Sequence, residues 1–353
     1  MHFRGIGTAT PTARYTKAQC LAAFRASDWF SRLSPRSHLV VSKVLQHDNG
    51  IEARRLALGS LEEAFAMDPD TLARRFAEHA PDLASRAARN ALERAGLAVA
   101  DVGAVVVSTC TGYLCPGLSG YVVERLGLRP DVQTFDLVGQ GCAAALPNLQ
   151  LCRALLASGA CEHVLSVCVE VSSAAMYLDD DPGVQISACL FGDGAGAAVL
   201  SRESLPGSTD VEWIDSRSFI DPRRREVLRF EERGGMLRNI LSRSVPVIAA
   251  EFAQRVLHEV LGRAGLRVAD IATWAMHPGG RDVLLALAQR LEVPAERFRY
   301  SAAVLREYGN LSSASVYFVL DAALADSAPA GWWWLSSFGA GFACHGALLR
   351  VGR

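Results

Sequence analysis

Cys142 is the residue of this sequence with the clearest capacity for covalent chemistry. It stands in the segment FDLVGQGCAAALPN, where an apolar strand is predicted to end at Val138 and a Gly-Gln-Gly turn leads into a helix rich in Ala and Leu. A thiol at the start of such a helix lies over backbone N–H groups without helical partners, and this positive helix end favours the thiolate. Cys142 is therefore a candidate acyl-accepting nucleophile. A small cysteine packed into a tight turn explains this segment equally well.

His277 and Asn310 are the second and third candidates. His277 ends a predicted strand in WAMHPGG, directly before a Pro-Gly-Gly turn, and side chains in the loops at strand ends often serve in binding and catalysis. Asn310 follows Gly309 in EYGNLSSAS and precedes an apolar helix, where Asn310, Ser312 and Ser313 are all good capping residues. Capping alone is a sufficient explanation for Asn310 until it is considered together with the cysteine and the histidine.

An internal repeat indicates which elements position these residues. The segment ERAGLAVADVGAVVVST (residues 93–109) recurs as GRAGLRVADIATWAMHP (residues 262–278), and each copy predicts a helix end capped by Gly, a short polar turn and a buried strand. A second pair follows in the same order, FGDGAGAAVLS from Phe191 and FGAGFACHGALLR from Phe338. Two matches in one order indicate a duplicated α/β unit.

The rest of the chain mostly fits two similar α/β halves. Amphipathic helices alternate with short Val- and Ala-rich strands, which indicates strands buried on both faces. We place the halves at residues 1–205, with the cysteine, and 206–353, with the histidine and the asparagine. Residues 209–244 depart from the alternation, because the stretch DPRRREVLRFEERGG predicts a solvated loop or hairpin, with a pocket wall as the alternative.

The composition is that of a compact globular protein rather than of a nucleic-acid-binding one. Of 353 residues, 50% are hydrophobic and 21% are charged, and the formal net charge is −1. No apolar stretch reaches membrane-spanning length and the N-terminal segment has no signal-peptide core, so we expect a cytoplasmic protein. The nine cysteines form no CxxC pair and are expected to be reduced thiols. His163, between Cys161 and Cys168, fits core packing better than a metal site, so no metal is expected.

Taken in this order, these features resemble the thiolase-fold condensing enzymes, and within them the type III polyketide synthases, also called the chalcone and stilbene synthase family. The resemblance runs through nearly the whole chain, in the segments GIGTATPTARYT, STCTGYLCPG, VGQGCAAALPN, LFGDGAG, HPGG, YGNLSSAS and SFGAGFACHG. The HPGG and GNLSSAS pair is the specific part. Ketoacyl synthases of type III look similar around the nucleophile but usually carry His-Gln-Ala-Asn where this chain has HPGG, which favours the polyketide branch.

The resemblance implies a fold and a reaction. The fold would be thiolase-like, with the two duplicated halves in a five-layered αβαβα arrangement. Cys142 would take a starter acyl group from a coenzyme A (CoA) thioester, and His277 and Asn310 would bind the thioester oxygen of malonyl-CoA. Loss of carbon dioxide would leave an enolate that attacks the acyl group, without a metal, nicotinamide or other cofactor. An imidazolium beside Cys142 would keep the thiol ionised near neutral pH, and repeated extension would end in a resorcinol- or pyrone-type product.

The same resemblance assigns residues to an acyl-binding cavity. Phe191 matches an aromatic gatekeeper between a CoA tunnel and the cavity, although core packing before a Gly turn also explains it. Asn239 stands where chalcone synthases have a second gatekeeper Phe, and Ala175 stands where they have Thr. Cys110 and Thr111 occupy a Thr-Ser pair of the cavity wall. These departures favour an aliphatic starter, as in alkylresorcinol and alkylpyrone synthases, over a plant-like aromatic one.

Four further residues receive less specific assignments. Ser312, beside Asn310, is expected to line the cavity. Cys115 precedes a proline and matches a residue that reaches into the partner's cavity across a dimer interface, which implies a homodimer, although it would also serve as an ordinary loop residue. Arg54 and Arg55 match the region that meets the CoA phosphates, but exposed arginines are common.

Three other functions remain open on the sequence alone. A ketoacyl synthase would make a single condensation onto an acyl carrier protein. An inactive thiolase-fold protein would act as a binding partner, which the intact Cys, His and Asn disfavour. A thiol-redox protein would need a resolving cysteine next to Cys142, and the sequence has none there.

Overall fold

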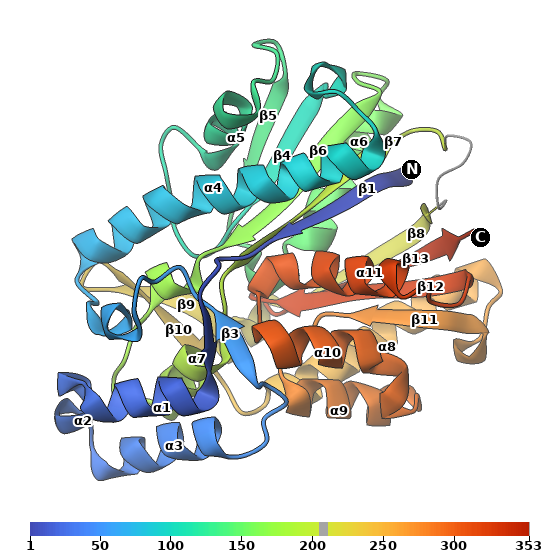
Figure 1. Cartoon of the computed structure of the whole chain (residues 1–353). Coiled ribbons are helices and arrows are strands. Elements are labelled where there is room, and N and C mark those ends of the chain that lie inside the picture. The colour runs from blue at the N-terminus through green and yellow to red at the C-terminus, as the bar shows by residue number, and fades with distance from the viewer. Residues whose placement is uncertain (205–210, 353) are drawn as a thin grey trace.

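The computed structural model describes residues 1–204 and 211–352 of the chain, in which helices and strands alternate as predicted (Figure 1). The boundary that we placed between residues 205 and 206 lies outside the described residues and stays a prediction. The strands are β1 (His2–Ala9), β2 (Arg14–Thr16), β3 (Ala53–Arg55), β4 (Ala104–Ser108), β5 (Gln133–Leu137), β6 (His163–Glu170), β7 (Gly194–Ser201), β8 (Val211–Ile220), β9 (Leu228–Arg233), β10 (Met236–Leu241), β11 (Ile271–Met276), β12 (Gly331–Gly339) and β13 (Ala343–Val351). The helices are α1 (Lys17–Ala26), α2 (Asp28–Arg32), α3 (Pro35–Gln46), α4 (Pro69–Ala95), α5 (Leu118–Leu126), α6 (Ala145–Ala157), α7 (Pro182–Leu190), α8 (Val245–Ala264), α9 (Arg281–Leu291), α10 (Arg299–Tyr308) and α11 (Ser315–Ala325).

Nine of the described strands form one mixed sheet in the order β11-β12-β13-β8-β1-β7-β6-β4-β5. The sheet divides between β8 and β1 into two parts of the same topology. In one part β6 is parallel to β4 and antiparallel to β7, which is antiparallel to β1. In the other, β12 is parallel to β11 and antiparallel to β13, which is antiparallel to β8. The duplication predicted from the sequence repeat is therefore confirmed by the strand pairing.

The repeated segments also form the same local structure. α4 and α8 end in Gly96 and Gly265, whose φ and ψ are 62° and 30° in the first copy and 66° and 28° in the second. Glycine adopts this left-handed conformation without the strain that a Cβ would cause. A 3₁₀ turn follows each cap, and Asp101 and Asp270 each accept a hydrogen bond from a backbone N–H three residues earlier, at 2.9 and 2.8 Å. A buried strand follows each turn, β4 in the first copy and β11 in the second.

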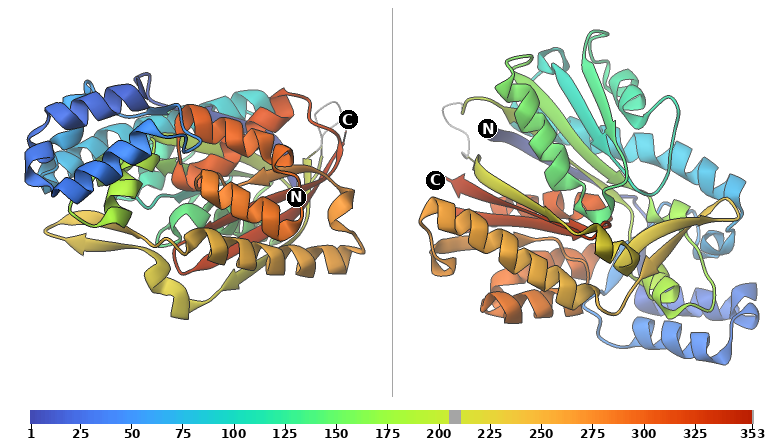
Figure 2. Two further views of the ribbon diagram at one scale, coloured as in Figure 1. Left: turned by 90° about the horizontal axis from the view of Figure 1, so that it is seen from below. Right: turned by 180° about the vertical axis from the view of Figure 1, so that it is seen from behind.

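Helices and sheet halves stack in the five layers expected for a thiolase-like fold (Figures 1 and 2). α6 and α11 form the middle layer, because α6 contacts β4 and β6 on one side and β12 and β13 on the other, while α11 contacts β1 and β7 as well as β11 and β12. α4 and α5 cover the outer face of the N-terminal half. α8 and α9 cover the outer face of the C-terminal half.

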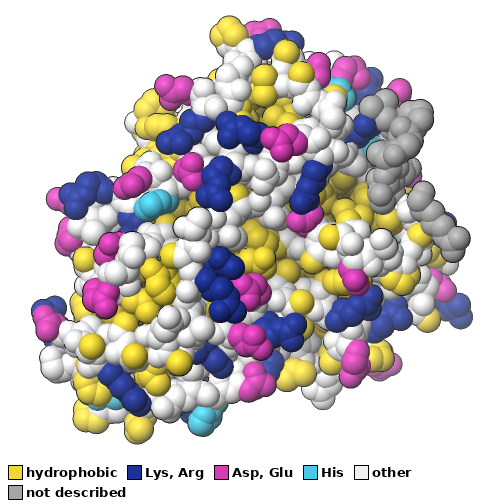
Figure 3. Space-filling model, viewed as in Figure 1, with side chains coloured by type: hydrophobic (Ala, Val, Ile, Leu, Met, Phe, Trp, Pro, Cys, Tyr) yellow, Lys and Arg dark blue, Asp and Glu magenta, His cyan; other side chains and the backbone are white. Residues whose placement is uncertain are grey.

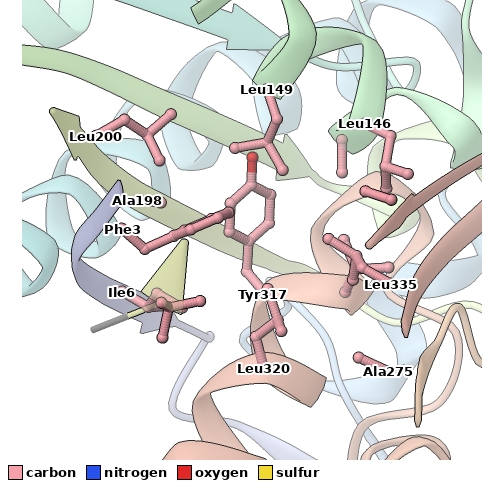
Figure 4. Close-up of a cluster of buried hydrophobic side chains, with 14 of the residues drawn as sticks. Phe3, Ile6, Leu146, Leu149, Ala198, Leu200, Ala275, Tyr317, Leu320 and Leu335 are labelled. Atoms are coloured by element: carbon pink, nitrogen blue, oxygen red, sulfur yellow. The ribbon is translucent and has the colours of Figure 1, made fainter. Parts of the chain in front are cut away.

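The middle layer is a closely packed apolar core (Figure 4). Tyr317 of α11 lies there among Phe3 of β1, Ala198 of β7 and Leu149 of α6. Its hydroxyl lies 2.7 Å from the Ser166 Oγ, so the polar end of this buried side chain has a partner. This core fixes the chain segments that enter α6 and α11, which carry the candidate cysteine and asparagine.

The Arg-rich segment from Val211 to Ser244 is more ordered than its sequence predicted. The expected departure from the α/β alternation is wrong for β8, which precedes the DPRRREVLRFEERGG stretch and pairs with β13 inside the main sheet. The expectation of a hairpin is correct for β9 and β10, which pair with each other in a separate two-stranded sheet.

The molecular surface carries both signs of charge. Lys and Arg side chains alternate with Asp and Glu over the face shown in Figure 3, without a single-sign patch that would suit a nucleic acid. In residues 1–204 and 211–352, no helix is both long and apolar enough to span a membrane.

Candidate active site

The structure brings the predicted nucleophile and its two partners to the junction of the sheet halves. Cys142 lies in the 3₁₀ turn Gly141–Ala143, directly before α6, so the regular helix starts slightly later than predicted. His277 follows the last residue of β11, as predicted, and its N–H donates to the carbonyl oxygen of Ser336 at 2.8 Å. Asn310 lies between α10 and the short turn that opens α11.

Hydrogen bonds connect Asn310 to Ser312 and Gly279, which lie next to Cys142 and His277 respectively. Its Oδ1 accepts from the backbone N–H of Ser312 at 2.8 Å, but Leu311 and Ala314 occupy the N-cap positions of the turn and of α11, so the capping interpretation of Asn310 is wrong. Because this bond fixes the amide orientation, Nδ2 points to the other side, where it donates to the carbonyl oxygen of Gly279 at 3.2 Å. Gly279 lies against the His277 ring, since a Cβ at this glycine would lie 3.5 Å from His277 Nε2. The Ser312 Oγ lies 3.3 Å from the Cys142 sulfur.

Ser312 holds an unusual backbone conformation at this junction. Its φ is +50°, in the left-handed region that non-glycine residues rarely adopt. A residue held there costs on the order of 1 kcal/mol or more, and such strain concentrates at functional sites. The conformation allows the Ser312 N–H to meet Asn310 while its hydroxyl meets Cys142.

Burial disfavours the charged forms of both the cysteine and the histidine. His277 is 1% exposed, its ring packs edge-on against Phe338 at 5.1 Å, and its Nδ1 has no partner among the described residues. Desolvation lowers the pKa of His277 to about 3. Desolvation likewise raises the pKa of Cys142 to about 12, although the Ser312 hydroxyl acts in the opposite direction. Burial of both groups therefore opposes the resting thiolate–imidazolium pair that the resemblance implied, and that pair stays a prediction.

A cavity of about 670 Å³ opens beside Cys142. All of the residues predicted to line it apart from Cys115 do so, namely Cys110, Thr111, Ala175, Phe191, Asn239 and Ser312. The β9–β10 hairpin supplies Leu228, Arg229 and Phe230, so the pocket-wall interpretation of the Arg-rich segment is correct for this part. His277 and Asn310 do not belong to the wall of this cavity, because they are 1% and 4% exposed and lie behind it.

Glu170 is a central residue of the site that the sequence reasoning missed. It ends β6, is fully buried, and accepts hydrogen bonds from the Cys110 N–H at 3.0 Å, the Thr111 hydroxyl at 3.0 Å and the Ser312 hydroxyl at 3.3 Å. Ser313 Oγ donates to the same carboxyl group. Burial raises the pKa of Glu170. The sequence did carry a signal for Glu170, which is the lone acidic residue at the end of the apolar run VLSVCVEV. A charged residue rarely lies in a buried strand unless other groups bind it.

The structure corrects the prediction that Arg54 meets CoA phosphates. Arg54 is 6% exposed, and its Nη1 donates inward to the carbonyl oxygens of Ala188 and Phe191 at 2.7 and 3.0 Å. It therefore holds the chain that carries Phe191 instead of facing solvent. Arg55 is partly exposed and pairs with Glu307 at 3.2 Å, so its cation is already partnered.

Cys115 lies outside the cavity, as an exposed residue in a cis peptide bond with Pro116. Its predicted role across a dimer interface concerns a second chain and stays a prediction. All nine cysteines are free thiols in the described structure. Among residues 1–204 and 211–352, no group of three or more His, Cys, Asp or Glu side chains is arranged to hold a metal ion.

Comparison with family models gives matches over both halves of the chain. Residues 29–209 match the model described as FAE1/Type III polyketide synthase-like protein. Residues 219–351 match the model described as chalcone and stilbene synthases, C-terminal domain.

Curated relatives are similar over nearly the full length. The chain is 30% identical to the alpha-pyrone synthesis polyketide synthase-like Pks18 of Mycobacterium tuberculosis, over 98% of this chain and 91% of that protein. It is also 30% identical to the 3,5-dihydroxyphenylacetyl-CoA synthase of Amycolatopsis balhimycina, over 90% of this chain and 83% of the relative.

Solved structures agree in fold. The 1,3,6,8-tetrahydroxynaphthalene synthase of Streptomyces coelicolor superposes with a TM-score of 0.89 at 22% identity, covering 100% of both chains. PKS-I of the brown alga Ectocarpus siliculosus superposes with a TM-score of 0.89 at 27% identity, covering 99% of this chain and 98% of that one.

Proposed function

Because this chain belongs to the type III polyketide synthases of the chalcone and stilbene synthase family, which are acyltransferases that catalyse Claisen condensation, we propose that Cys142 is its acyl-carrying nucleophile. The observation that supports this assignment best is the contact between the Ser312 hydroxyl and the Cys142 sulfur, at 3.3 Å. It joins the cysteine to the segment that also orients Asn310, and Asn310 in turn reaches the turn that follows His277.

The first step is acyl transfer. The Cys142 sulfur attacks the carbonyl carbon of an acyl-CoA, the bond to the CoA sulfur breaks, and the cysteine proton leaves with the CoA thiol. A neutral cysteine suits this exchange, because the proton and the leaving group depart together. No metal or organic cofactor takes part in our proposal.

The second step is decarboxylative condensation. Malonyl-CoA loses carbon dioxide, and the resulting enolate carbon attacks the Cys142 thioester and displaces the cysteine sulfur as a thiolate, which gives a β-ketoacyl-CoA. This product is transferred back to Cys142, with release of the CoA thiol, before each further extension. We assign the stabilisation of the enolate oxygen to a ring N–H of neutral His277 and to the Asn310 Nδ2, which donates at the same turn. The orientation of the amide supports this role, since its oxygen is engaged by Ser312 and Nδ2 carries a second N–H besides the one that it donates to Gly279.

An aliphatic starter is our proposal for the acyl group. The catalytic cavity shares Met176 and Ala188 with a second pocket whose other walls are mostly apolar, including Phe24, Val41 and Leu45. An alkyl tail that passes Met176 would be desolvated there, at roughly 0.8 kcal/mol per buried methylene. The names of the relatives include a pyrone synthesis protein, and we propose a resorcinol- or pyrone-type product for this chain as well.

Product analysis tests the proposed function. The purified protein is incubated with malonyl-CoA and a series of straight-chain acyl-CoAs, and products are identified by mass spectrometry. We expect several malonyl extensions and a cyclised product, and Cys142→Ala should abolish both the acyl-enzyme and the product. A single β-ketoacyl product, or activity confined to an acyl carrier protein, would instead identify a ketoacyl synthase.

We further propose that the enzyme is a cytoplasmic homodimer. β5 is the outermost strand of its sheet half, and Tyr113 and Val138, near its end, are 78% and 61% exposed. These two side chains line the mouth of an open hollow of about 1380 Å³, which shares Cys110 and Thr111 with the catalytic cavity. An exposed sheet edge beside apolar side chains suits a second copy of the chain, which would close the hollow.

A further inference from the structure

Pro147 lies in the first turn of α6, the helix that follows Cys142. A backbone N–H at this position of an α-helix would donate to the carbonyl oxygen of Ala143, four residues earlier, but proline has no N–H and its ring crowds that oxygen. The backbone between them is helical, since Ala144 has φ −57° and ψ −27° and the N–H of Asn148 donates to its carbonyl oxygen at 2.9 Å. The proline therefore deprives Ala143, the residue directly after the cysteine, of its regular helical partner.

A side chain of β12 takes the place of the missing donor. The Ser337 Oγ donates to the carbonyl oxygen of Ala143 at 3.0 Å, across 194 positions of sequence. Both residues are fully buried, so bulk water cannot supply this bond. A buried carbonyl oxygen needs a partner, and Ser337 provides the one that Pro147 cannot.

The chain on the other side of Cys142 gives the turn little support. Gly139 and Gly141 precede the cysteine with φ of 81° and 55°, conformations that glycine adopts without strain. Neither the turn Gly141–Ala143 nor α6 has a side-chain hydrogen bond at its N-cap. The backbone of the nucleophile is therefore restrained mainly from its C-terminal side, where Ser337 holds Ala143.

β12 is a rigid element from which to hold this turn. It lies between β11 and β13 in the main sheet, and Ser337 pairs with His345 of β13. It also packs against α6 in the middle layer. A hydroxyl on such a strand has a fixed position, so its bond fixes the carbonyl group that it meets.

We propose that Ser337 is a positioning residue for Cys142, which fixes the turn Gly141–Ala143 so that the thiol meets the acyl carbonyl carbon in a reactive geometry. The inference rests on the proposed function of Cys142. Ser337 itself does not touch the substrate, because it lines neither the catalytic cavity nor the open hollow beside it. A misplacement of about 1 Å costs up to roughly a hundredfold in rate. Loss of the bond should therefore slow acylation without weakening the binding of acyl-CoA.

The test measures acylation of Cys142 in the wild type, Ser337→Ala, Pro147→Ala and the double variant. Each protein is mixed with octanoyl-CoA at several concentrations and quenched at intervals, and the acylated fraction of Cys142 is read by peptide mass spectrometry. We expect Ser337→Ala to lower the limiting rate constant about fivefold or more, with the half-saturating concentration unchanged within about twofold.

The double variant distinguishes the proposed role from a general loss of stability. Pro147→Ala returns a backbone N–H to the helix, where it can donate to the carbonyl oxygen of Ala143. The Ser337 hydroxyl is then no longer needed at this oxygen. The double variant should therefore acylate at the rate of Pro147→Ala, within about twofold, although Ser337→Ala alone is slow.

Ser201→Ala is the matched control. Ser201 is also a buried strand serine, and its Oγ donates to the carbonyl oxygen of Glu203 at 2.6 Å. It lies far from the site, because it pairs with His163 at the start of β6, whereas Glu170 ends that strand. Its melting temperature should fall as in Ser337→Ala, while its limiting rate constant should equal that of the wild type.

An unchanged limiting rate constant in Ser337→Ala, or a double variant as slow as Ser337→Ala, overturns the inference while the proposed function stands. If Ser337→Ala alone does not fold, Pro147→Ala and the double variant decide, since equal rates support the inference and a slower double variant overturns it. A wild type whose Cys142 stays unmodified by octanoyl-CoA and its longer homologues overturns the proposed function and the inference together.

Discussion

Cys142 and His277 share an environment that opposes charge on either side chain. The structure places His277 behind the cavity wall with one ring nitrogen unpartnered, and it surrounds Cys142 with Ser312, Cys110 and the acidic Glu170. The helix end that favours a thiolate is too weak to offset this desolvation, since such an interaction contributes on the order of 1 kcal/mol. The reactivity of Cys142 therefore depends on how the substrate binds and on where the cysteine proton is transferred.

The pH dependence of alkylation follows from the raised pKa of Cys142. A thiol with a pKa of about 12 is protonated at neutral pH, and its thiolate fraction rises about tenfold for each pH unit below that pKa. Iodoacetamide should therefore modify Cys142 about a hundredfold faster at pH 9 than at pH 7, measured by peptide mass spectrometry. A rate that levels off near pH 7 would show that the thiolate is stabilised after all.

Ser312 and Glu170 should shift the same rate in opposite directions. The Ser312 hydroxyl lowers the pKa of Cys142 and the Glu170 charge raises it. Ser312→Ala should therefore slow alkylation at pH 8, and Glu170→Gln should accelerate it, each by roughly three- to tenfold, since one pKa unit changes the thiolate fraction tenfold. Circular dichroism of both variants provides the control for folding. Two variants that shift the rate in the same direction would contradict these assignments.

At the scale of elements, the end of β12 fixes the turn that carries Cys142. A Cβ at Gly339 would lie 2.5 Å from the backbone nitrogen of Ala143 and 3.0 Å from that of Cys142. Atoms cannot approach so closely, so this strand reaches the nucleophile turn only because the residue is glycine. The neighbouring Phe338 packs on His277, so β12 supports both of the side chains to which we assign catalytic roles.

Gly339→Ala should accordingly damage both stability and reactivity. We expect the free energy of unfolding to fall by about 1–3 kcal/mol, as for other overpacked sites, with altered alkylation of Cys142. Gly262→Ala is the matched control, because Gly262 lies inside α8 with open space around its Cβ position and should gain up to about 1 kcal/mol. Urea unfolding of both variants gives the comparison, and equal effects would refute the steric argument.

At the scale of the whole molecule, the middle layer of α6 and α11 joins two equivalent halves, and the proposed catalytic groups come from both. This arrangement leaves one side of the site, at Tyr113 and Val138, open in the single chain. Closing it by a second copy would remove exposed apolar side chains from water and separate the reacting acyl chain from solvent.

Light scattering tests the proposed dimer. The wild type should have about twice the 37.9 kDa mass of one chain, and Val138→Glu should shift it toward the monomer and lose condensation activity. Leu285→Glu is the control, because Leu285 is 50% exposed on α9, a helix of the C-terminal half. A monomeric wild type with full activity would contradict the proposed dimer.

The sequence by itself determined the alternation of elements and the duplicated halves, and it supplied Cys142, His277 and Asn310 as candidates whose roles stay predictions. These follow from short-range patterns, such as a strand that ends at a glycine turn, and from a repeat that can be read along the chain. The α/β class with two similar halves follows from the same information, whereas the thiolase-like arrangement of those halves was expected from the family resemblance.

Only the tertiary structure decided the electrostatics and the surroundings of the site. Charge on Cys142 and His277 depends on desolvation by residues distant in sequence, and Glu170 meets Ser312 across 142 positions. Arg54 was predicted to be exposed because its sequence neighbours give no indication of the carbonyl oxygens it binds. Burial and long-range contact are properties of the packed molecule, and no local pattern encodes them.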